Sequence, residues 1–318
     1  MSTTPEEHFL KSMRMDFDML YQQKESRLFK TVRVEPQNAL SDEYKFIGLL
    51  DDDDDETAVR HADTVWTEVP HSTRWATLVA KDKAVPLDKN DKKMMGPYDP
   101  TNGYVQSITG YFGRYVDRKI LRGIAGTVKT GIDAGTTVNS YDSGECRLIQ
   151  SNGDVVAAGG NFTNQSATGL TTVKLQTIQA LMTNAGVPDD GRRWLAIDIY
   201  TLEVMLKDTT YGAEEIKALR DIRSGKMAGL FGLNFVILPQ SQFVVNGTDT
   251  ECYETAAWHQ DAVLLATGDG GYSPEIRIDE RPDKKYTKQI FANMYSAAIR
   301  LHGPGVVRIL LPTLSKVA

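Results

Sequence analysis

The sequence predicts an α+β fold, and three kinds of segment support this class. One long stretch, from about residue 100 to 124, has the apolar periodicity of an amphipathic helix. A second, from 171 to 238, alternates short strand-like and helix-like patterns. A third, from 286 to 301, lacks Gly and Pro and is apolar at odd and even positions, which is typical of a strand covered on both faces. Together they indicate helices packed against sheets.

The long helix has a well-marked start. Asp99 is a favoured N-cap residue, and Pro100 suits the first helical position because its φ is already helical and its missing N–H would have no partner there. Glycines in the segment lower its helix propensity, so packing must supply most of its stability. The side chains expected to pack against a sheet are Tyr104, Ile108, Tyr111, Phe112, Tyr115, Val116 and Ile120, with Arg114, Asp117, Arg118 and Arg122 mostly offset from them.

Residues 57–93 alternate in the manner of a long two-stranded ribbon. The ribbon carries many lysines, so it is too polar for a core hairpin, and an isolated hairpin is only marginally stable. We therefore expect it to lie on a neighbour.

Six consecutive acids, Asp51 to Glu56, form the strongest charge run in the chain. Mutual repulsion favours an extended, solvated loop. The carboxylates of Asp51, Asp53 and Asp55 are the candidates for a calcium site, but contiguous acids lack the spacing that brings ligands together on one ion. We therefore expect no metal here.

The remaining elements are read from short patterns. In residues 1–48, Phe9, Met13, Phe17 and Leu20 recur at helical spacing, and this helix could pack on a neighbour or on its own domain. A Gly303–Gly305 turn and a strand at 306–311 should pair with the 286–301 strand, forming a sheet under the long helix. The middle of the chain predicts helices at 171–185, 201–207 and 213–223 and strands at 194–199, 235–238 and 263–267.

Composition is that of a globular protein. The 318 residues are 41% hydrophobic and 25% charged, which argues against global disorder. The net charge of −6 disfavours broad attraction to nucleic acid. Cys146 and Cys252 have no metal-site or redox spacing, and the sequence shows neither a secretory signal nor a membrane span.

Catalytic and cofactor motifs are missing from the sequence. Gly225-Lys226 lacks the other residues of a phosphate-binding loop, and Ser224 lacks those of a nucleophile elbow. The five histidines are dispersed, and His259 near Asp261 is better explained as a hydrogen-bonded histidine before a strand. We therefore expect no catalytic, cofactor or metal residues.

The order of these segments resembles the major capsid (coat) proteins of tailed bacteriophages, which have the Hong Kong 97-type fold. The resemblance covers nearly the whole chain and is sharpest in PLDKNDKKMMGPYDPTNGYV with the helix after it, in RRWLAIDIYTLEVMLKD and in IRSGKMAGLFGLNFVILPQ. It implies an N-terminal arm (1–49), an extended loop (50–95), a peripheral domain with the spine helix (96–129), an axial domain (130–275) and C-terminal peripheral strands (276–318).

The resemblance also implies function and partners. The chain would self-assemble through hexamers and pentamers into an icosahedral shell that encloses double-stranded DNA without sequence-specific binding. Because the chain starts almost directly with the arm, a separate scaffolding protein is implied, together with a portal protein and a decoration or cement protein. The shell would assemble in the cytoplasm of a bacterial host, away from membranes, and become the virion capsid. The intersubunit residues on the loop would be Asp52, Trp66, Trp75, Lys81 and Lys83.

Two alternatives remain. The same fold builds encapsulin-like nanocompartments, whereas strand–helix alternation would also suit a soluble α/β enzyme. Some relatives cross-link subunits through a Lys and an Asn, for which Lys81 or Lys83 with Asn293 could be proposed, although no motif supports it.

Overall fold

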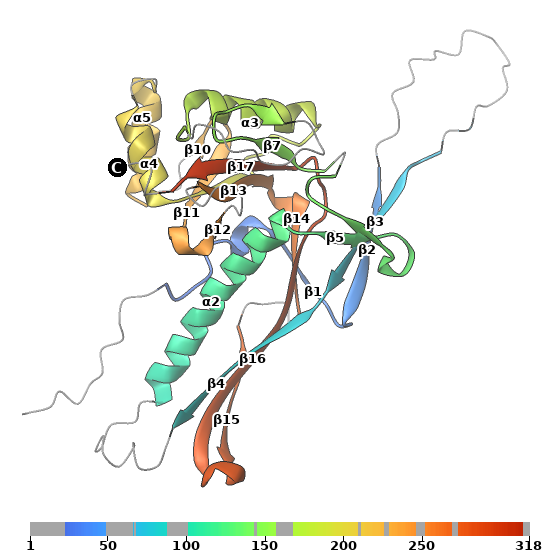
Figure 1. Cartoon of the computed structure of the whole chain (residues 1–318), viewed down its shortest axis with the longest axis vertical. Helices are drawn as coiled ribbons and strands as arrows, with labels where there is room; N and C mark the ends of the chain where they lie inside the picture. Colours follow the sequence, from blue (N-terminus) through green and yellow to red (C-terminus); the bar gives the residue numbers. More distant parts are fainter. Residues whose placement is uncertain are drawn as a thin grey trace, which may run out of the picture.

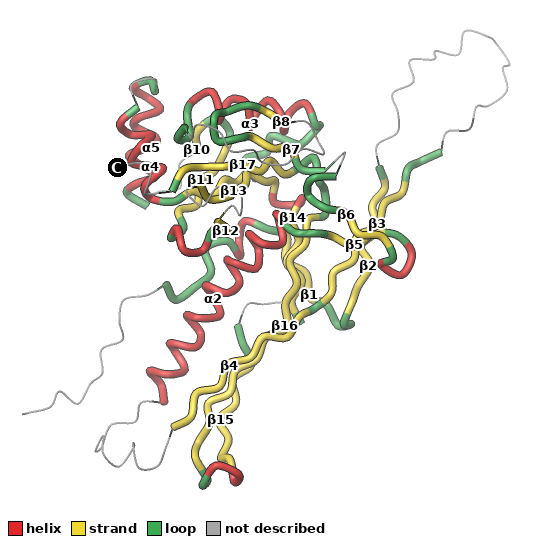
Figure 2. Tube along the Cα trace, viewed as in Figure 1, coloured by secondary structure: helices red, strands yellow, loops and turns green. Residues whose placement is uncertain are grey.

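The computed structural model describes residues 23–48, 66, 68–87, 101–142, 145–156, 168–208, 211–225, 229–245, 252–268 and 273–313. The expected N-terminal helix, the acidic run and the Asp99–Pro100 helix start lie outside these residues. An elongated lower part, made of one helix and long strands, joins a compact upper part that combines helices with a second sheet (Figures 1 and 2). A two-stranded ribbon projects to one side (Figure 1).

The long predicted helix is α2, Thr101–Ala125, and it packs against the long strand β16, Thr287–Arg300. Ile108, Phe112 and Ile120 are buried as the periodicity predicted, and Tyr104, Tyr111 and Tyr115 pack at the edge of the same core. Asp117, expected to be mostly offset from the apolar face, is fully buried.

The elongated sheet has the strand order β1-β14-β16-β15, with β4 on the other edge of β16. β14 and β15 pair antiparallel with successive parts of β16, and β1 pairs parallel with β14. All nine residues of β4 pair with β16, so the second half of the expected ribbon is a strand of this sheet. The bounds are β1 Arg33–Pro36, β4 Val79–Leu87, β14 Val263–Thr267 and β15 Glu275–Arg281.

The projecting ribbon consists of β2, Ser41–Ile47, and β3, His71–Thr77, which pair antiparallel along their full length. At its base β3 joins β5, Val128–Thr130, and β5 joins β6, Thr136–Val138. The ribbon therefore forms from residues on both sides of the acidic run. The predicted pairing within 57–93 was wrong, because β3 and β4 enter different sheets.

The upper sheet has the order β10-β11-β9-β13-β17-β7-β8, with β12 paired to β13. β17 pairs with β13 and β7 in this sheet, so its predicted pairing with the 286–301 strand was wrong. After β16, a turn closed by a hydrogen bond from Val306 N to Gly303 O directs the chain into the upper sheet. The bounds are β7 Arg147–Ile149, β8 Val155–Val156, β9 Arg193–Ile197, β10 Gly229–Leu230, β11 Leu233–Ile237, β12 Val244–Val245, β13 Cys252–His259 and β17 Val306–Pro312.

Helices α3, Thr172–Asn184, α4, Ile199–Lys207, and α5, Ala213–Arg223, accompany the upper sheet, close to their predicted bounds (Figure 1). Thr171 and Asp198 cap the first two, as their side-chain oxygens accept backbone N–H groups. Gly186 follows α3 with φ of 72°, a conformation that favours glycine. Short 3₁₀ turns occupy Phe29–Thr31, Ile132–Ala134, Gln240–Gln242, Gln260–Ala262 and Pro282–Lys284.

One large apolar core extends from α2 through the upper sheet and its helices. A smaller cluster at the ribbon base contains Ala76, Leu78, Ile299 and Leu301. At this end β16 is covered on both faces, as predicted. Further along, the face with Phe291, Asn293 and Tyr295 is only partly covered within the subunit. No helix among the described residues is long and apolar enough to cross a membrane.

Candidate assembly surfaces

The chain from Gln23 to Thr31, here called the arm base, is fixed to the middle of α2 by Asp117. The Asp117 carboxylate accepts hydrogen bonds from Ser26 Oγ at 2.6 Å and from the backbone N of Arg27 and Leu28, each at 3.0 Å. Gln23 Nε2 donates to its second oxygen at 2.5 Å. A buried carboxylate is stable here because several donors satisfy it.

Further contacts hold the arm base. A Cβ on Gly113 of α2 would lie 3.1 Å from the Ser26 backbone nitrogen, so the absence of a side chain lets the arm cross the helix closely. Arg114 donates to the Gln23 carbonyl at 3.0 Å, and Trp258 Nε1 donates to the Thr31 carbonyl at 2.9 Å. The arm base therefore packs against its own subunit, and Gln23, to which the preceding residues are joined, is held in place.

The ribbon base is joined to α2 by a buried ion-pair network. Glu145 accepts from Arg74 of β3 at 2.5 Å and from Arg300 of β16 at 2.8 Å. Arg300 also donates to the carbonyls of Ile124 and Gly126, at 2.8 and 3.1 Å. A cation at the C-terminal end of a helix compensates its unpaired carbonyls and its dipole. This cluster links the ribbon, α2 and the elongated sheet.

The upper sheet holds further buried polar groups with structural roles. Arg308 forms an ion pair with Glu254 and donates to Ser140 Oγ at 2.6 Å. Lys174 Nζ donates to the carbonyls of Ser151 and Thr168 at 2.8 and 2.7 Å, and burial lowers its pKa to about 8.

The two cysteines are free and buried. Burial raises the pKa of the Cys146 thiol to about 11, so the unreactive thiol form predominates at neutral pH.

Large apolar side chains are exposed on the ribbon and next to its strands in the chain. Trp66 is 92% exposed and Ile47 75% exposed, and Leu40 at the ribbon base is also exposed. Trp75, by contrast, is half-buried and donates from Nε1 to the Gly131 carbonyl at 2.8 Å. Exposed apolar residues on a projecting element are typical of a surface that another chain covers.

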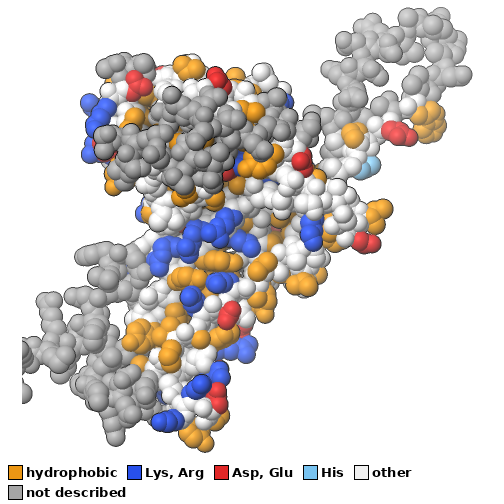
Figure 3. Space-filling model, viewed as in Figure 1, with side chains coloured by type: hydrophobic (Ala, Val, Ile, Leu, Met, Phe, Trp, Pro, Cys, Tyr) orange, Lys and Arg blue, Asp and Glu red, His pale blue; other side chains and the backbone are white. Residues whose placement is uncertain are grey.

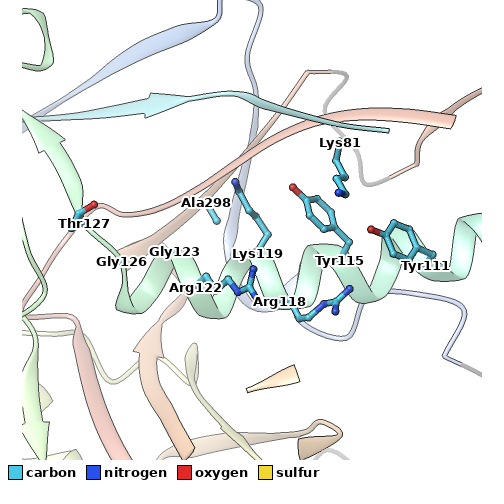
Figure 4. A pocket seen from close by; sticks show the side chains of 10 residues that line it. All are labelled: Lys81, Tyr111, Tyr115, Arg118, Lys119, Arg122, Gly123, Gly126, Thr127 and Ala298. Carbon is cyan, nitrogen blue, oxygen red and sulfur yellow. The ribbon is translucent and has the colours of Figure 1, made fainter. Parts of the chain in front are cut away.

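A basic groove runs between α2 and the elongated sheet, with a volume of about 470 Å³. Lys81 extends from β4 towards Tyr111 and Tyr115, and Arg118, Lys119 and Arg122 follow α2 (Figure 4). Lys and Arg side chains form a band at the level of α2, with hydrophobic side chains beside it (Figure 3). Below, "basic groove" means the site of Lys81, Arg118, Lys119 and Arg122.

The groove's charges repel one another. Burial and the neighbouring Arg122 lower the pKa of Lys119. None of the four cations forms an ion pair with another described residue. Sequence reasoning missed this groove, although Arg114, Arg118 and Arg122 recur at intervals of four on one helix face.

The open face of the elongated sheet is lined by Gln289, Phe291, Asn293 and Tyr295 of β16 together with charged residues of β15. Tyr295 is 45% exposed. Lys81 and Lys83 pair with Met294 and Ala292, so they lie on the opposite, helix-facing side of the sheet from Asn293. Lys83 Nζ stands 5.0 Å from the centre of the Tyr111 ring.

The described part of the chain holds no cluster of side chains arranged to bind a metal ion. No group of three or more His, Cys, Asp or Glu side chains converges there. His259 contacts Asp190 at 3.1 Å and accepts from the Asp261 backbone N at 3.3 Å, in agreement with a hydrogen-bonded structural histidine.

Comparison with known proteins decides the family. The family model described as phage capsid protein matches residues 6–312, nearly the whole chain. The chain belongs to the phage capsid protein family. No curated protein matches it. This family membership confirms the resemblance read from the sequence, including the α+β fold of the Hong Kong 97 type.

Solved phage capsids share this fold at low sequence identity. The capsid of cyanophage Pam1 is similar with a TM-score of 0.69 at 15% identity, covering 98% of each chain. The capsid of Ralstonia phage GP4 has a TM-score of 0.66 at 12% identity, covering 96% of each chain. The capsid of Helicobacter pylori bacteriophage KHP30 has a TM-score of 0.64 at 10% identity, covering 98% of each chain.

In this capsid protein the residues expected on an intersubunit loop separate into three groups. Trp66 is exposed beyond the ribbon. Trp75 is held at the ribbon base by the hydrogen bond from its Nε1, and Lys81 and Lys83 lie on β4. Asp52 and the calcium candidates Asp51, Asp53 and Asp55 lie outside the described residues. The helix residues Tyr104, Ile108, Tyr111, Phe112 and Tyr115 all reach the core formed with the sheets.

Proposed function

We propose that this capsid subunit assembles through hexamers and pentamers into an icosahedral shell that encloses double-stranded DNA without reading its sequence. The observation that carries the proposal is the projecting ribbon of β2 and β3, with Ile47 exposed on it and Trp66 exposed beyond it. The open face around Tyr295 adds a second surface for other copies to cover. Repeated, symmetric contacts of modest strength together give a stable closed shell.

We infer the domain division from the family and from strand pairing. The arm (1–49), the loop (50–95), the peripheral domain (96–129 and 276–318) and the axial domain (130–275) remain the proposed units. We propose two changes to these bounds: β4 would join the peripheral domain because it pairs with β16, and β17 would join the axial domain because it pairs with β13.

The proposed partners are other copies of the chain, a scaffolding protein, a portal protein and a decoration or cement protein. Assembly would take place in the cytoplasm of a bacterial host. The role is structural, with no enzymatic step and no cofactor. Family membership favours a phage shell over the encapsulin-like compartment and over the α/β enzyme.

The test is assembly of the purified chain, alone and with its scaffolding partner. We expect capsomers or closed shells in sedimentation velocity and in negative-stain micrographs. A species that stays monomeric at every concentration, with the scaffolding protein present, would contradict the proposal.

A further inference from the structure

We propose that the basic groove of one subunit binds the acidic run, residues 51–56, of a second copy of the chain. This inference rests on the proposed self-assembly and names a contact within it. It concerns the charged groups of the groove, which form no ion pair with the described residues of their own subunit.

The cations of the groove have no counter-ions among the residues that the structure describes. Arg118 and Lys119 are half-buried and Arg122 is exposed, yet no described acid pairs with them or with Lys81. Holding like charges together is unfavourable, and burial together with the neighbouring Arg122 lowers the pKa of Lys119. A segment that supplies carboxylates would relieve this repulsion and gain charge-assisted hydrogen bonds.

Spacing along the two segments matches. Arg118 and Arg122 are four residues apart on α2, which corresponds to a rise of about 6 Å along a helix. In an extended chain, alternate side chains on one side lie about 7 Å apart. Successive carboxylates on one side of the acidic run can therefore meet successive cations of the groove, while Lys81 lines the opposite wall.

The charge balance of the chain favours a peptide over DNA as the occupant. The chain has 42 Asp and Glu against 36 Lys and Arg, so the six acids of the run equal its whole acidic excess. Pairing the run with the groove would compensate all four cations of the groove and four of the six acids in each subunit of a shell. DNA in the groove would leave the run without compensation.

The location of the run favours a second copy over its own subunit. The run follows β2, which ends at Ile47, and precedes β3, which begins at His71. Asp51 is four residues beyond Ile47, a reach of about 14 Å at full extension. The ribbon projects away from α2 (Figure 1), so the run starts at a point away from the groove of its own subunit.

Charge reversal in the full chain tests the contact. The groove variant is Arg118→Glu with Arg122→Glu, and the run variant is Asp52→Lys with Asp54→Lys. We expect each to lower the yield of particles assembled with scaffold, and their combination to restore part of that yield, because the exchanged charges again attract. Circular dichroism and melting scans verify that each variant is folded.

A matched control carries the same charge change elsewhere. Lys217 and Arg220 are exposed on α5, and Lys217→Glu with Arg220→Glu should leave assembly unchanged. Normal assembly of both the groove and the run variant, or no restoration in their combination, would overturn the inference.

Direct binding separates the inference from the proposed function. A labelled peptide of residues 49–57 should bind wild-type subunits in fluorescence anisotropy and bind the groove variant about tenfold more weakly. The same peptide with Asn at 51–55 should bind as weakly. If wild type forms no particles, the proposed function fails while this measurement still decides the inference. A groove variant that loses binding to a duplex DNA oligomer but binds the peptide normally would show a nucleic-acid surface and overturn the inference.

Discussion

Neighbouring charged residues on α2 have opposite roles because their burial differs. Asp117 is fully buried and receives the arm base, whereas Arg118, one position later, lies half-buried in the basic groove. One residue rotates a helical side chain by about 100° around the axis, which moves it from the arm side to the groove side. At the buried position of Asp117, a carboxylate without hydrogen-bond donors would be strongly unfavourable.

Replacing Asp117 by Ala should destabilise the subunit. The backbone N–H groups of Arg27 and Leu28 and the Ser26 hydroxyl would lose their acceptor inside the protein. Unsatisfied buried donors are unfavourable by about 1–3 kcal/mol each, so we expect a loss of about 3 kcal/mol. Urea unfolding of the unassembled subunit gives the change, and amide hydrogen exchange should be faster at Arg27 and Leu28.

The comparison variant is Asp279→Ala, which removes an exposed carboxylate from β15 and should change stability by less than about 0.5 kcal/mol. Equal stabilities of the Asp117 and Asp279 variants would refute the anchoring role of Asp117.

At the scale of elements, α2 approaches β16 so closely that one position requires glycine. A Cβ on Gly123 would lie 2.4 Å from the Ala298 carbonyl oxygen and 2.6 Å from its carbon. Backbone atoms of a central strand cannot rotate aside, so the helix itself would have to move. This contact sets the distance between α2 and the elongated sheet.

The substitution Gly123→Ala should therefore destabilise, although alanine is the better helix former. Helix propensity favours Ala by about 1 kcal/mol, whereas overpacking of a core contact is unfavourable by about 1–3 kcal/mol. We expect a net loss of about 1 kcal/mol in the free energy of unfolding, measured in urea.

Alanine substitutions at two other positions of α2 serve as comparisons for Gly123→Ala. Ser107→Ala on the exposed face should be neutral or slightly stabilising. Gly113→Ala meets the arm base at 3.1 Å, so it should be less harmful than Gly123→Ala. A Gly123→Ala protein more stable than wild type would show that the helix shifts freely.

At the scale of the whole molecule, the strands that form one sheet come from distant parts of the sequence. β4 and β16 are about 200 residues apart, and all nine residues of β4 pair with β16. β3 supplies Arg74 to the buried network and Ala76 to the core of the ribbon base. β3 and β4 are therefore part of their own subunit's structure.

Replacing residues 57–93 with a short Gly-Ser linker should unfold the subunit. The change removes β3 and β4, leaves an unpaired edge on β16 and isolates Glu145 from Arg74. We expect loss of native circular dichroism and of a cooperative melting transition.

Replacing only residues 51–65 keeps β2, β3 and β4 and should preserve the fold while reducing assembly. A folded protein after the larger replacement would show that the subunit core does not need β3 and β4.

The sequence predicted the elements whose pattern is local. The α2 face at Ile108, Phe112 and Ile120, helices α3 and α5 and strand β14 all follow from patterns along the chain. The sequence also contained the signal of the basic groove, in cations four residues apart. It could not reveal that Lys81 faces them, because β4 reaches α2 through its pairing with β16.

By itself the sequence determined the fold class, the long helix and the resemblance to phage capsids, because side-chain periodicity and segment order lie along the chain. Only the tertiary structure decided that β3 and β4 enter different sheets, that β17 leaves β16 for the upper sheet, and that Asp117 is buried under the arm base. An alternating strand can pair with many others equally well. The choice among partners depends on which burial of apolar surface and which satisfaction of polar groups the whole chain can achieve at once.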